Sequence, residues 1–568
     1  MKYKLQIAFI PWRFYLLSIL ILLVVAGLII RMIDLAVIER HFLRNQGDAR
    51  ALRLVSEPSF RGMITDRNGY PLAVSTSVYS VWFNPKELLE PLPPKTLKDL
   101  ASVLTMNPKN IQSLLSQPKN KNREFLYLKR EVSPAIANQV KLLKIPGVFL
   151  QQDYKRFYPD GEIAAHVIGF TNIDDRGQEG LELAYNGWLT GRPGKKYVIK
   201  DRLGRIITNV QTMQTQQSGN DLVLSINRRI QYLAYRELMA GIEKNQAVSG
   251  SVIVLDVNTG EVLAMVNQPS YNPNKIIPQQ KDSIRNRAVT DTFEPGSTIK
   301  AFSITTALES GKFKPNNIID TSPGWINVDR HVVQDEHNNG PITLTQILQL
   351  SSNVGVTKVM LTLPSTQLWN LLHRFGFGEV TGVGFPGEQA GRLIKRPTWK
   401  PFALATLSFG YGIAVTPLQL AHAYATLANG GVKIPLTLLR QEKPPVGERV
   451  IDPKIARLML GMLQSVVEKG GTAEDARVPG YVVAGKTGTA NLVGVHGYEK
   501  HRFNSSFVGI APATRPRLVV AVIIHDPRGK QHLGGFVSGP VFEKIMEGSL
   551  RILNIAPDDP ASLQSAIS

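Results

Sequence analysis

The sequence predicts an α+β protein with one transmembrane helix near its N-terminus and a five-stranded antiparallel sheet in its C-terminal half. Residues 14–30 form an apolar run without a charge, residues 251–266 have the pattern of a β-hairpin, and residues 480–527 contain three further strand-like segments. Because helical patterns lie between the early and the late strands, strands and helices do not alternate as in a doubly wound parallel sheet. We therefore expect an antiparallel sheet flanked by helices.

The apolar run at residues 14–30 would span ~26 Å as a helix, slightly less than a ~30 Å hydrocarbon core. Trp12 and the flanking Arg13 and Arg31 extend the segment to the membrane interfaces. The basic residues before the run predict that residues 1–13 stay in the cytoplasm and that the rest is exported. A cleaved signal peptide is the alternative, but no small-residue cleavage site follows and the apolar helical pattern continues, which favours an uncleaved anchor.

The composition is basic, with 65 lysines and arginines against 45 aspartates and glutamates, and it contains no cysteine. A net charge of +20 suits nucleic acid, anionic lipid or an acidic wall polymer. No basic run is interleaved with aromatic residues, so scattered solubilising charge is favoured over nucleic-acid binding. The absence of cysteine excludes disulfides, zinc–thiolate sites, a thiol nucleophile and a lipidated cysteine anchor.

The stretch 293–310 places Ser297 and Lys300 one turn apart at the start of a buried apolar helix that ends at Gly311. A serine hydroxyl becomes a nucleophile when a base removes its proton, and a neutral lysine can be that base. A free lysine has a pKa of ~10.4, so burial, the positive helix terminus or a second cation must lower it. The spacing alone is weak, because Ser116 and Lys119 repeat it.

Two further motifs follow in order, Ser351-Ser352-Asn353 and then Lys486-Thr487-Gly488-Thr489. The segments GSTIK, LSSNVG and AGKTGTA together resemble those of penicillin-binding transpeptidases. Over nearly the whole chain the resemblance is to division-specific class B penicillin-binding proteins, which are peptidoglycan D,D-transpeptidases. In these proteins a non-catalytic pedestal carries short motifs of its own. The residues of this chain that resemble those motifs are Arg61, Gly62, Asp66, Arg67, Gly69, Arg156 and Glu182.

The expected order of parts follows from the patterns and from this resemblance. A polar stretch at 211–220 is interpreted as a linker, and the last residues are expected to be disordered. The parts are a cytoplasmic N-terminus (1–13), a transmembrane helix (14–30), a mostly β or mixed pedestal (31–215), a transpeptidase domain with the serine β-lactamase-like fold (216–555) and a disordered tail (556–568).

The resemblance also implies a role for each motif residue. Ser297 would attack the penultimate D-alanine carbonyl of a stem peptide, Lys300 would be the base, and Ser351 would relay the proton to the leaving amine. Asn353 would bind the peptide amide, while Lys486 in an exposed strand edge, with Thr487, Gly488 and Thr489, would bind the peptide and its carboxylate. The backbone N–H groups of Ser297 and Thr489 would form the oxyanion hole.

The implied ligands are peptidoglycan stem peptides and β-lactams, which bind covalently at Ser297. The implied protein partners are an FtsW-like glycan polymerase and other membrane proteins of the division machinery. The polymerase would bind through the anchor and residues 61–69. No metal, organic cofactor or nucleic acid is implied, and the implied location is the bacterial inner membrane with the catalytic domain in the periplasm. A membrane-anchored β-lactam hydrolase and an inactive scaffold remain alternatives.

Three rival motifs are weaker. Residues 480–487 match the P-loop pattern, but Tyr481 to Val483 are strand-like and Gly488 interrupts any following helix. The segment 331–337, HVVQDEH, lacks the spacing of a zinc-binding helix and is interpreted as a surface loop. No Gly-x-Ser-x-Gly elbow occurs, which argues against an α/β-hydrolase.

Overall fold

The computed structural model describes residues 11–87, 92–120, 123–200, 206–277, 279, 281–494 and 497–562. Its contacts group the chain into two compact units. The first unit comprises residues 1–59, 77–154 and 191–218, and the second comprises residues 60–76, 155–190 and 219–568. Two segments of the expected pedestal, 60–76 and 155–190, therefore belong to the unit that carries the predicted five-stranded sheet.

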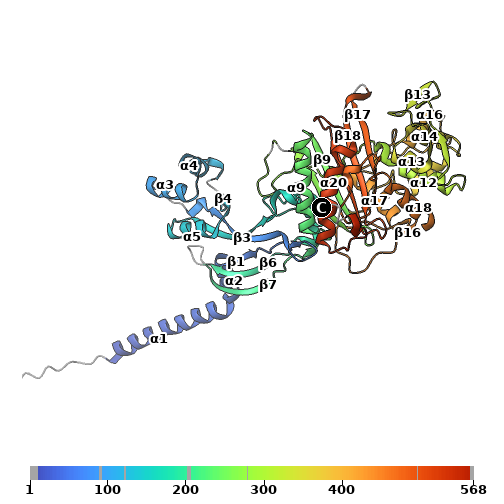
Figure 1. Ribbon diagram of the computed structural model, residues 1–568. Helices are drawn as coiled ribbons and strands as arrows, with labels where there is room; N and C mark the ends of the chain where they lie inside the picture. The colour runs from blue at the N-terminus through green and yellow to red at the C-terminus, as the bar shows by residue number, and fades with distance from the viewer. Residues whose placement is uncertain are drawn as a thin grey trace, which may run out of the picture. The chain divides into compact units, whose positions relative to one another are not determined.

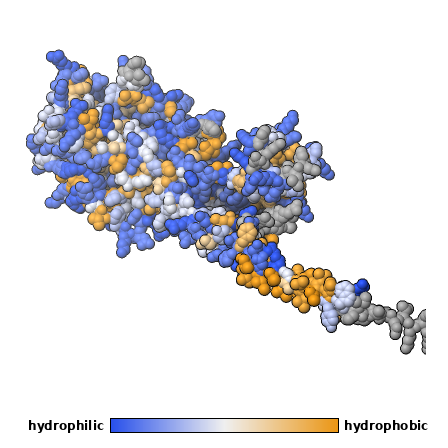
Figure 2. All heavy atoms as spheres, turned by 180° about the vertical axis from the view of Figure 1, so that it is seen from behind, coloured by the Kyte–Doolittle hydropathy of each residue, from blue (hydrophilic) through white to orange (hydrophobic). Residues whose placement is uncertain are grey.

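The N-terminal helix α1 spans Pro11–Ile33 and continues into a π-helical turn, η1, at Asp34–Ile38. Within the described residues it is the one helix long and apolar enough to cross a membrane. Its apolar side chains are exposed, and Figure 2 shows them as a continuous hydrophobic surface. An exposed apolar surface of this length is typical of a segment whose solvent is lipid.

The first unit combines a small sheet with a helical cluster. Strands β1, β6 and β7 pair antiparallel, and β7 includes residues 211–214 of the expected linker. Strands β4 and β5 pair with β3, and the apolar core beside them, which includes Val81, Leu100 and Ile111, is covered by helices. The elements are α2 (Arg40–Ala51), β1 (Leu52–Glu57), β3 (Pro71–Phe83, which begins in the second unit), η2 (Pro85–Glu87), α3 (Pro94–Val103), α4 (Pro108–Ser116), η3 (Pro118–Asn120), β4 (Leu126–Val132), α5 (Pro134–Leu142), β5 (Val148–Phe157), β6 (Gly194–Lys200) and β7 (Ile206–Gln214).

The second unit is built on the predicted five-stranded antiparallel sheet, in the order β10-β9-β19-β18-β17 (Figure 1). The strands are β9 (Ser249–Asp256), β10 (Val262–Gln268), β17 (Ala484–Gly494), β18 (Gly497–Ala511) and β19 (Leu518–His525). Every residue of β9 is buried, so both faces of the sheet are covered. Helices α9 (Arg228–Lys244) and α20 (Gly539–Ile552) pack on one face and α17 (Pro417–Ala428) on the other. The predicted α+β fold class is confirmed.

Local signals set the ends of these helices. Asn227 caps α9, since its side chain accepts hydrogen bonds from the backbone N–H groups of Arg229 and Ile230. Thr416 and Gln419 form a capping box at the start of α17, with Pro417 in the first turn.

The remaining elements of the second unit form small hairpins and helices around the sheet. They are β2 (Ile64–Thr65), η4 (Gly161–Ile163), α6 (Ala165–Ile168), α7 (Gly180–Ala184), α8 (Asn186–Leu189), β8 (Leu222–Val223), α10 (Lys281–Ile284), α11 (Arg287–Thr290), η6 (Gly296–Ile299), α12 (Lys300–Glu309), β11 (Ile318–Asp320), β12 (Trp325–Val328), β13 (His331–Gln334), β14 (Pro341–Thr343), α13 (Leu344–Gln349), α14 (Asn353–Leu361), α15 (Gln367–Arg374), α16 (Pro401–Ser408), β15 (Val432–Lys433), β16 (Glu448–Arg449), α18 (Pro453–Gln464), η7 (Glu474–Ala476) and α19 (Gly534–Val537).

A buried ionic cluster joins the three motifs assigned to the pedestal. Glu182 accepts hydrogen bonds from Nε of Arg61 at 2.5 Å and from Nε of Arg156 at 2.6 Å, and all three side chains are almost fully buried. Removing one partner of a buried ion pair leaves an unpaired buried charge, so this cluster depends on all three residues. All three residues lie in the second compact unit.

Residues 66–69 contact helix α9 and strand β10 within the second unit. Asp66 accepts a hydrogen bond from the backbone N–H of Arg228 at the start of α9, and Arg67 pairs with Glu261 at 3.2 Å. Gly69 has a φ of +87° in the turn between β2 and β3, a conformation that favours glycine. Gly62 lies so close to Asn220 that an added Cβ would be 1.9 Å from its carbonyl oxygen.

The expected disorder of residues 556–568 is wrong for residues 556–562. Asp558 accepts hydrogen bonds from the backbone N–H of Val482 and the hydroxyl of Thr514, and the Asp559 N–H donates to the Gly480 carbonyl. These hydrogen bonds tie the segment to residues next to the sheet, so it is held in place although it is close to the chain end. Residues 563–568 lie outside the described residues.

Candidate active site

Ser297 lies in the 3-10 turn η6, immediately before Lys300 begins helix α12. In a 3-10 turn the side chains at i and i+3 eclipse, so these two side chains are on one face. Ser297 lines a cavity of about 460 Å³, whereas Lys300 is fully buried beneath it. The predicted helix is therefore present and buried, and its first turn is tighter than an α-helix.

The amine of Lys300 is held by the second motif. Its Nζ donates to the carbonyl of Ser351, to Oγ of Ser351 at 3.2 Å and to Oδ1 of Asn353 at 2.7 Å. Burial lowers the pKa of Lys300 to about 7, although Asp335 and Glu336 act in the opposite direction. A substantial fraction of this amine is therefore neutral near pH 7 and can accept a proton.

Ser351 lies between the two lysines of the site. Its Oγ is 3.2 Å from Nζ of Lys300 and 3.1 Å from Nζ of Lys486. The residue has a φ of +59°, in the left-handed region that non-glycine residues rarely adopt. Such backbone costs on the order of 1–3 kcal/mol and persists when the surrounding structure fixes it.

Lys486 lies on β17, which is an edge strand of the sheet. Its side chain is nevertheless fully buried. The reason is that Nζ turns inward to Ser351 Oγ and to Oγ1 of Thr487 at 3.2 Å. Burial and the neighbouring Lys300 lower the pKa of Lys486.

The residues after Lys486 bring β17 against the nucleophile turn. Oγ1 of Thr487 is 3.0 Å from Oγ1 of Thr472, and Oγ1 of Thr489 accepts from the N–H of Gly534 at 3.0 Å. Position 488 has room only for glycine, because an added Cβ would lie 2.7 Å from the carbonyl oxygen of Pro295. The structure thus brings together Ser297, Lys300, Ser351, Asn353, Lys486, Thr487, Gly488 and Thr489.

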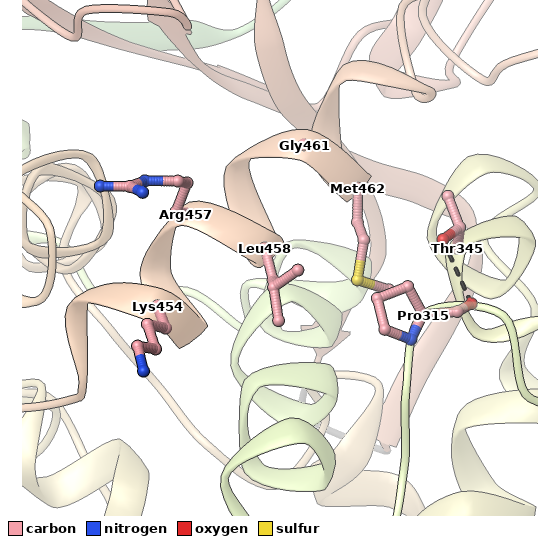
Figure 3. Close-up of a pocket in the computed structure, with 7 residues that line it drawn as sticks. All are labelled: Pro315, Thr345, Lys454, Arg457, Leu458, Gly461 and Met462. Carbon is pink, nitrogen blue, oxygen red and sulfur yellow. Dashed lines mark hydrogen bonds between the residues drawn. The ribbon is translucent and has the colours of Figure 1, made fainter.

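The wall of this cavity is partly aromatic and apolar. Phe503 and His532 stack with ring centroids 4.4 Å apart, and Leu533 and Phe536 lie beside them. Another cavity, of about 500 Å³, has different walls and contains no serine–lysine pair (Figure 3). It is lined by Pro315, Thr345, Lys454, Arg457, Leu458, Gly461 and Met462.

The rival motifs do not form sites of their own. Ser116 ends helix α4, where its hydroxyl donates to the Gln112 carbonyl, and Lys119 lies in the separate turn η3. Lys486 of the P-loop pattern lies inside strand β17, and the next described element is strand β18, which is not the geometry of a P-loop.

Several residues of the site were not predicted from the sequence, among them its aromatic wall and Asp335. Asp335, in the segment interpreted as a surface loop, accepts a hydrogen bond from the hydroxyl of Ser352 and from the backbone N–H of Asn353, both at 2.5 Å. In the sequence, Asp335 is recognisable only as an acidic residue near the second motif. Acidic residues at such a distance from a motif are too common to be informative.

A serine beside a buried lysine of lowered pKa, facing the edge strand of an antiparallel sheet, defines a serine enzyme of acyl transfer. Comparison with known proteins agrees. Residues 250–547 match the model of the penicillin-binding protein transpeptidase domain, and residues 56–224 match that of the penicillin-binding protein dimerisation domain.

Relatives cover almost the whole chain. The peptidoglycan D,D-transpeptidase FtsI of Escherichia coli K12 is 44% identical, over 97% of this chain and 93% of the relative. A peptidoglycan synthetase structure from Bifidobacterium adolescentis has a TM-score of 0.71 at 28% identity and covers 90% of this chain and 98% of its own. Penicillin-binding protein 3 of Mycobacterium tuberculosis, complexed with aztreonam, has a TM-score of 0.69 at 26% identity and covers 89% of this chain and 99% of its own. The chain belongs to the penicillin-binding protein transpeptidase family.

Proposed function

We propose that the protein is a peptidoglycan D,D-transpeptidase that cross-links stem peptides through an acyl-enzyme at Ser297, at the division septum. The observation that carries this proposal is the buried amine of Lys300, with a pKa of about 7, one turn from a serine that lines an open cavity. The relation to FtsI supports the septal role.

In the first step Oγ of Ser297 attacks the carbonyl carbon of the penultimate D-alanine, and neutral Lys300 takes the hydroxyl proton. The peptide C–N bond breaks as the ester forms, so terminal D-alanine leaves as an amine. Ser351 Oγ is within 3.2 Å of both lysine amines, which suits the relay of a proton to that leaving nitrogen. A positioned acid–base pair of this kind contributes typically 10²- to 10⁴-fold.

Substrate binding uses the edge strand. An extended peptide can add to β17 by backbone hydrogen bonds, with Asn353 binding a peptide amide. The hydroxyls of Thr487 and Thr489 suit the terminal carboxylate. The N–H groups of Ser297 and Thr489 would form the oxyanion hole, where each donor contributes ~3 to 4 kcal/mol.

In the second step an amine of a neighbouring stem peptide attacks the ester carbonyl. The new amide bond forms, the ester C–O bond breaks, and the proton of the attacking amine is returned to Ser297 through Lys300. A β-lactam presents its strained amide in place of the D-alanine carbonyl, and opening that ring leaves no departing fragment. The bulky adduct then blocks the approach of the amine.

We predict that the penicilloyl adduct is long-lived, which distinguishes a transpeptidase from a β-lactam hydrolase. Hydrolysis needs a water held beside a general base, which class A β-lactamases supply with a glutamate. Asp335 and Glu336 line the cavity of Ser297, but Asp335 is held by hydrogen bonds from Ser352, Asn353 and Val354. Between Ser351 and Lys486, a stretch the structure describes completely, no carboxylate lines the cavity. Glu388 instead accepts hydrogen bonds from the N–H and hydroxyl of Thr381.

The lifetime of the adduct is measured by stopped-flow acylation followed by a nitrocefin turnover assay. The expected result is one rapid equivalent of acylation and almost no further release. Sustained hydrolysis at many turnovers per second would assign the protein to the membrane-anchored β-lactamases instead. A chain that takes up no label would be the inactive scaffold.

We propose that α1 anchors the protein in the bacterial inner membrane, with residues 1–13 in the cytoplasm and the chain after Arg31 in the periplasm. The apolar helix and the basic residues that precede it support this orientation. A reporter active only in the periplasm, fused after Ser568, should be active. Activity of a strictly cytoplasmic reporter at the same position would contradict the orientation.

We also propose an FtsW-like glycan polymerase as a partner, through α1 and residues 61–69, together with other membrane proteins of the division machinery. Arg61 and Asp66 are buried, so they shape this segment and do not face a partner. Tyr70, next to the segment, is 57% exposed and offers a contact.

A further inference from the structure

An open groove of about 500 Å³ in the second unit lies outside the site of Ser297 and shares no described lining residue with it (Figure 3). Leu458 and Met462 of helix α18 form its apolar part together with Pro315. The carbonyl of Pro315 accepts hydrogen bonds from the hydroxyl of Thr345 at 3.3 Å and from its N–H at 3.2 Å. These bonds fix the wall opposite α18, so the groove is preformed.

The cationic side of the groove has no partner in the part of the chain that the structure describes. Lys454 and Arg457 lie one turn apart on α18, and both side chains are exposed and take part in no ion pair or hydrogen bond with a described residue. The neighbouring Asp452 caps the helix by accepting from the backbone N–H of Lys454 at 2.7 Å. Figure 3 shows both cationic side chains on one side of the groove and Pro315 on the other. The groove therefore presents uncompensated positive charge to a ligand.

Gly461 keeps the middle of the groove open. It lies inside α18, where every ordinary residue except proline is more favourable than glycine. Its φ is not in the left-handed region, and an added Cβ would meet no atom within 4 Å. Neither the backbone conformation nor the packing of the described chain therefore requires glycine here. A ligand that lies against the helix backbone would require it, since a side chain would fill this space.

The dimensions of the groove favour a short ligand over a folded partner. A stable protein–protein interface uses about 20–30 residues on each side, whereas seven described residues line this groove. Its volume lies in the range of ~300–1,000 Å³ that is typical of small-molecule sites. The two cations suit an anionic group and the apolar wall suits small alkyl groups. A short peptide with a free carboxylate and methyl side chains has both features.

We propose that this groove is a second, non-covalent binding site for peptidoglycan stem peptides, in which Lys454 and Arg457 bind the terminal carboxylate and the apolar wall contacts the D-alanine methyl groups. The inference rests on the proposed function, which supplies the stem peptide as the ligand. The peptide is bound there and not cleaved, because the lining residues include no serine–lysine pair.

Helix α18 connects this groove to the active site. It packs on α12, which begins with Lys300, and on β17, which carries Lys486. After α18 ends at Gln464, the chain continues to residues 470–472, which line the cavity of Ser297. A wall polymer with one stem peptide in each site is held at two points. When one peptide dissociates, the other keeps its local concentration at the enzyme high.

The test measures peptide binding while the active site is closed. The full-length protein in detergent is first acylated to completion at Ser297 with penicillin. Nα,Nε-diacetyl-L-lysyl-D-alanyl-D-alanine is then titrated, and saturation-transfer difference NMR of its D-alanine methyl protons reports binding. We expect saturation of these methyl signals. The same peptide with a C-terminal carboxamide should bind about tenfold more weakly, because it lacks the charge-assisted hydrogen bonds.

Variants separate the charge of the groove from its shape. Lys454→Glu and Arg457→Glu should each weaken binding by about tenfold or more, and the effect should decrease at high salt. Gly461→Leu keeps both cations and should remove binding by filling the groove. Arg229→Glu is the matched control, since Arg229 is also an exposed second residue of a helix, α9, on the sheet face opposite α17. It should bind the peptide like the wild-type protein.

Three results would overturn the proposal. The acylated protein gives no methyl saturation, the carboxamide binds as tightly as the carboxylate, or the Lys454 and Arg457 variants, folded by their thermal unfolding midpoints, bind like the Arg229 control. The first two use the wild-type chain and do not depend on the folding of a variant. Binding of poly-L-glutamate that depends on Lys454, without binding of the stem peptide, would assign the groove to an acidic protein segment and would also overturn it.

Failure of the proposed function has a different signature. In that case penicillin would not acylate Ser297, which the first step of the experiment measures. Failure of the inference alone leaves acylation complete, while the acylated protein binds no peptide.

Discussion

Ser297→Ala is expected to abolish covalent labelling by penicillin, with no adduct after an incubation that saturates the wild-type protein. Alanine removes the oxygen that forms the ester, and the other hydroxyl beside Lys300, that of Ser351, serves in the proposed mechanism as a proton relay and not as the nucleophile. The fold should be retained, because the Ser297 side chain is only partly buried and makes room for substrate. Fluorescence of the protein band and peptide mapping of the adduct measure the effect.

The chain supplies a matched control in its second Ser-x-x-Lys. Ser116→Ala should label at the wild-type rate, since Ser116 donates to Gln112 and Lys119 lies outside its helix. An adduct mapped to Ser116, or one that persists in Ser297→Ala, would show that the nucleophile has been assigned wrongly.

Much of the fold of the second unit could be predicted because its signals are local. The hairpin of β9 and β10 follows from two apolar runs around Asn258-Thr259-Gly260, and the start of α17 follows from Thr416 and Pro417. Each of these features depends on residues within a few positions of one another. The nucleophile helix was predictable for the same reason.

Features that depend on distant residues could not be predicted from the sequence. Asp335 accepts hydrogen bonds from Ser352 and Asn353 because β13 brings a loop that is distant in sequence to the start of α14. Glu182 accepts from an arginine 121 residues away, and no local pattern shows that both are buried. The burial of the Lys486 side chain was also not predicted. A position on a strand indicates the face of the sheet on which a side chain lies, but not which residues cover that face.

Two segments that were expected to lack regular contacts have partners in the structure. Residues 211–214 were interpreted as linker but extend β7, because pairing with β6 uses backbone groups and tolerates polar side chains. The tail through Ser562 was expected to be disordered, yet its aspartates accept hydrogen bonds next to the sheet. In both cases the polar groups had partners that only the folded chain supplies.

Lys300→Arg should be nearly as inactive in acylation as Lys300→Ala, with a loss of about 10²- to 10⁴-fold. Arginine keeps the positive charge but is not deprotonated in proteins, so it cannot accept the proton of Ser297. Lys300, in contrast, can lose its proton near neutral pH, since burial lowers its pKa to about 7. Below that pH the amine is protonated and above it neutral, so the wild-type rate should rise with pH through about 7 and then level off.

The Arg and Ala variants together separate the base from the charge. If Lys300 served only as a cation for Ser351 and Asn353, arginine would replace it and acylate at near the wild-type rate, which would contradict the mechanism. Because the side chain is fully buried, thermal unfolding of the Arg variant must show that the larger group is accommodated. A folded Arg variant whose residual rate is independent of pH near 7, beside a wild-type profile that rises there, is the result expected of a neutral lysine base.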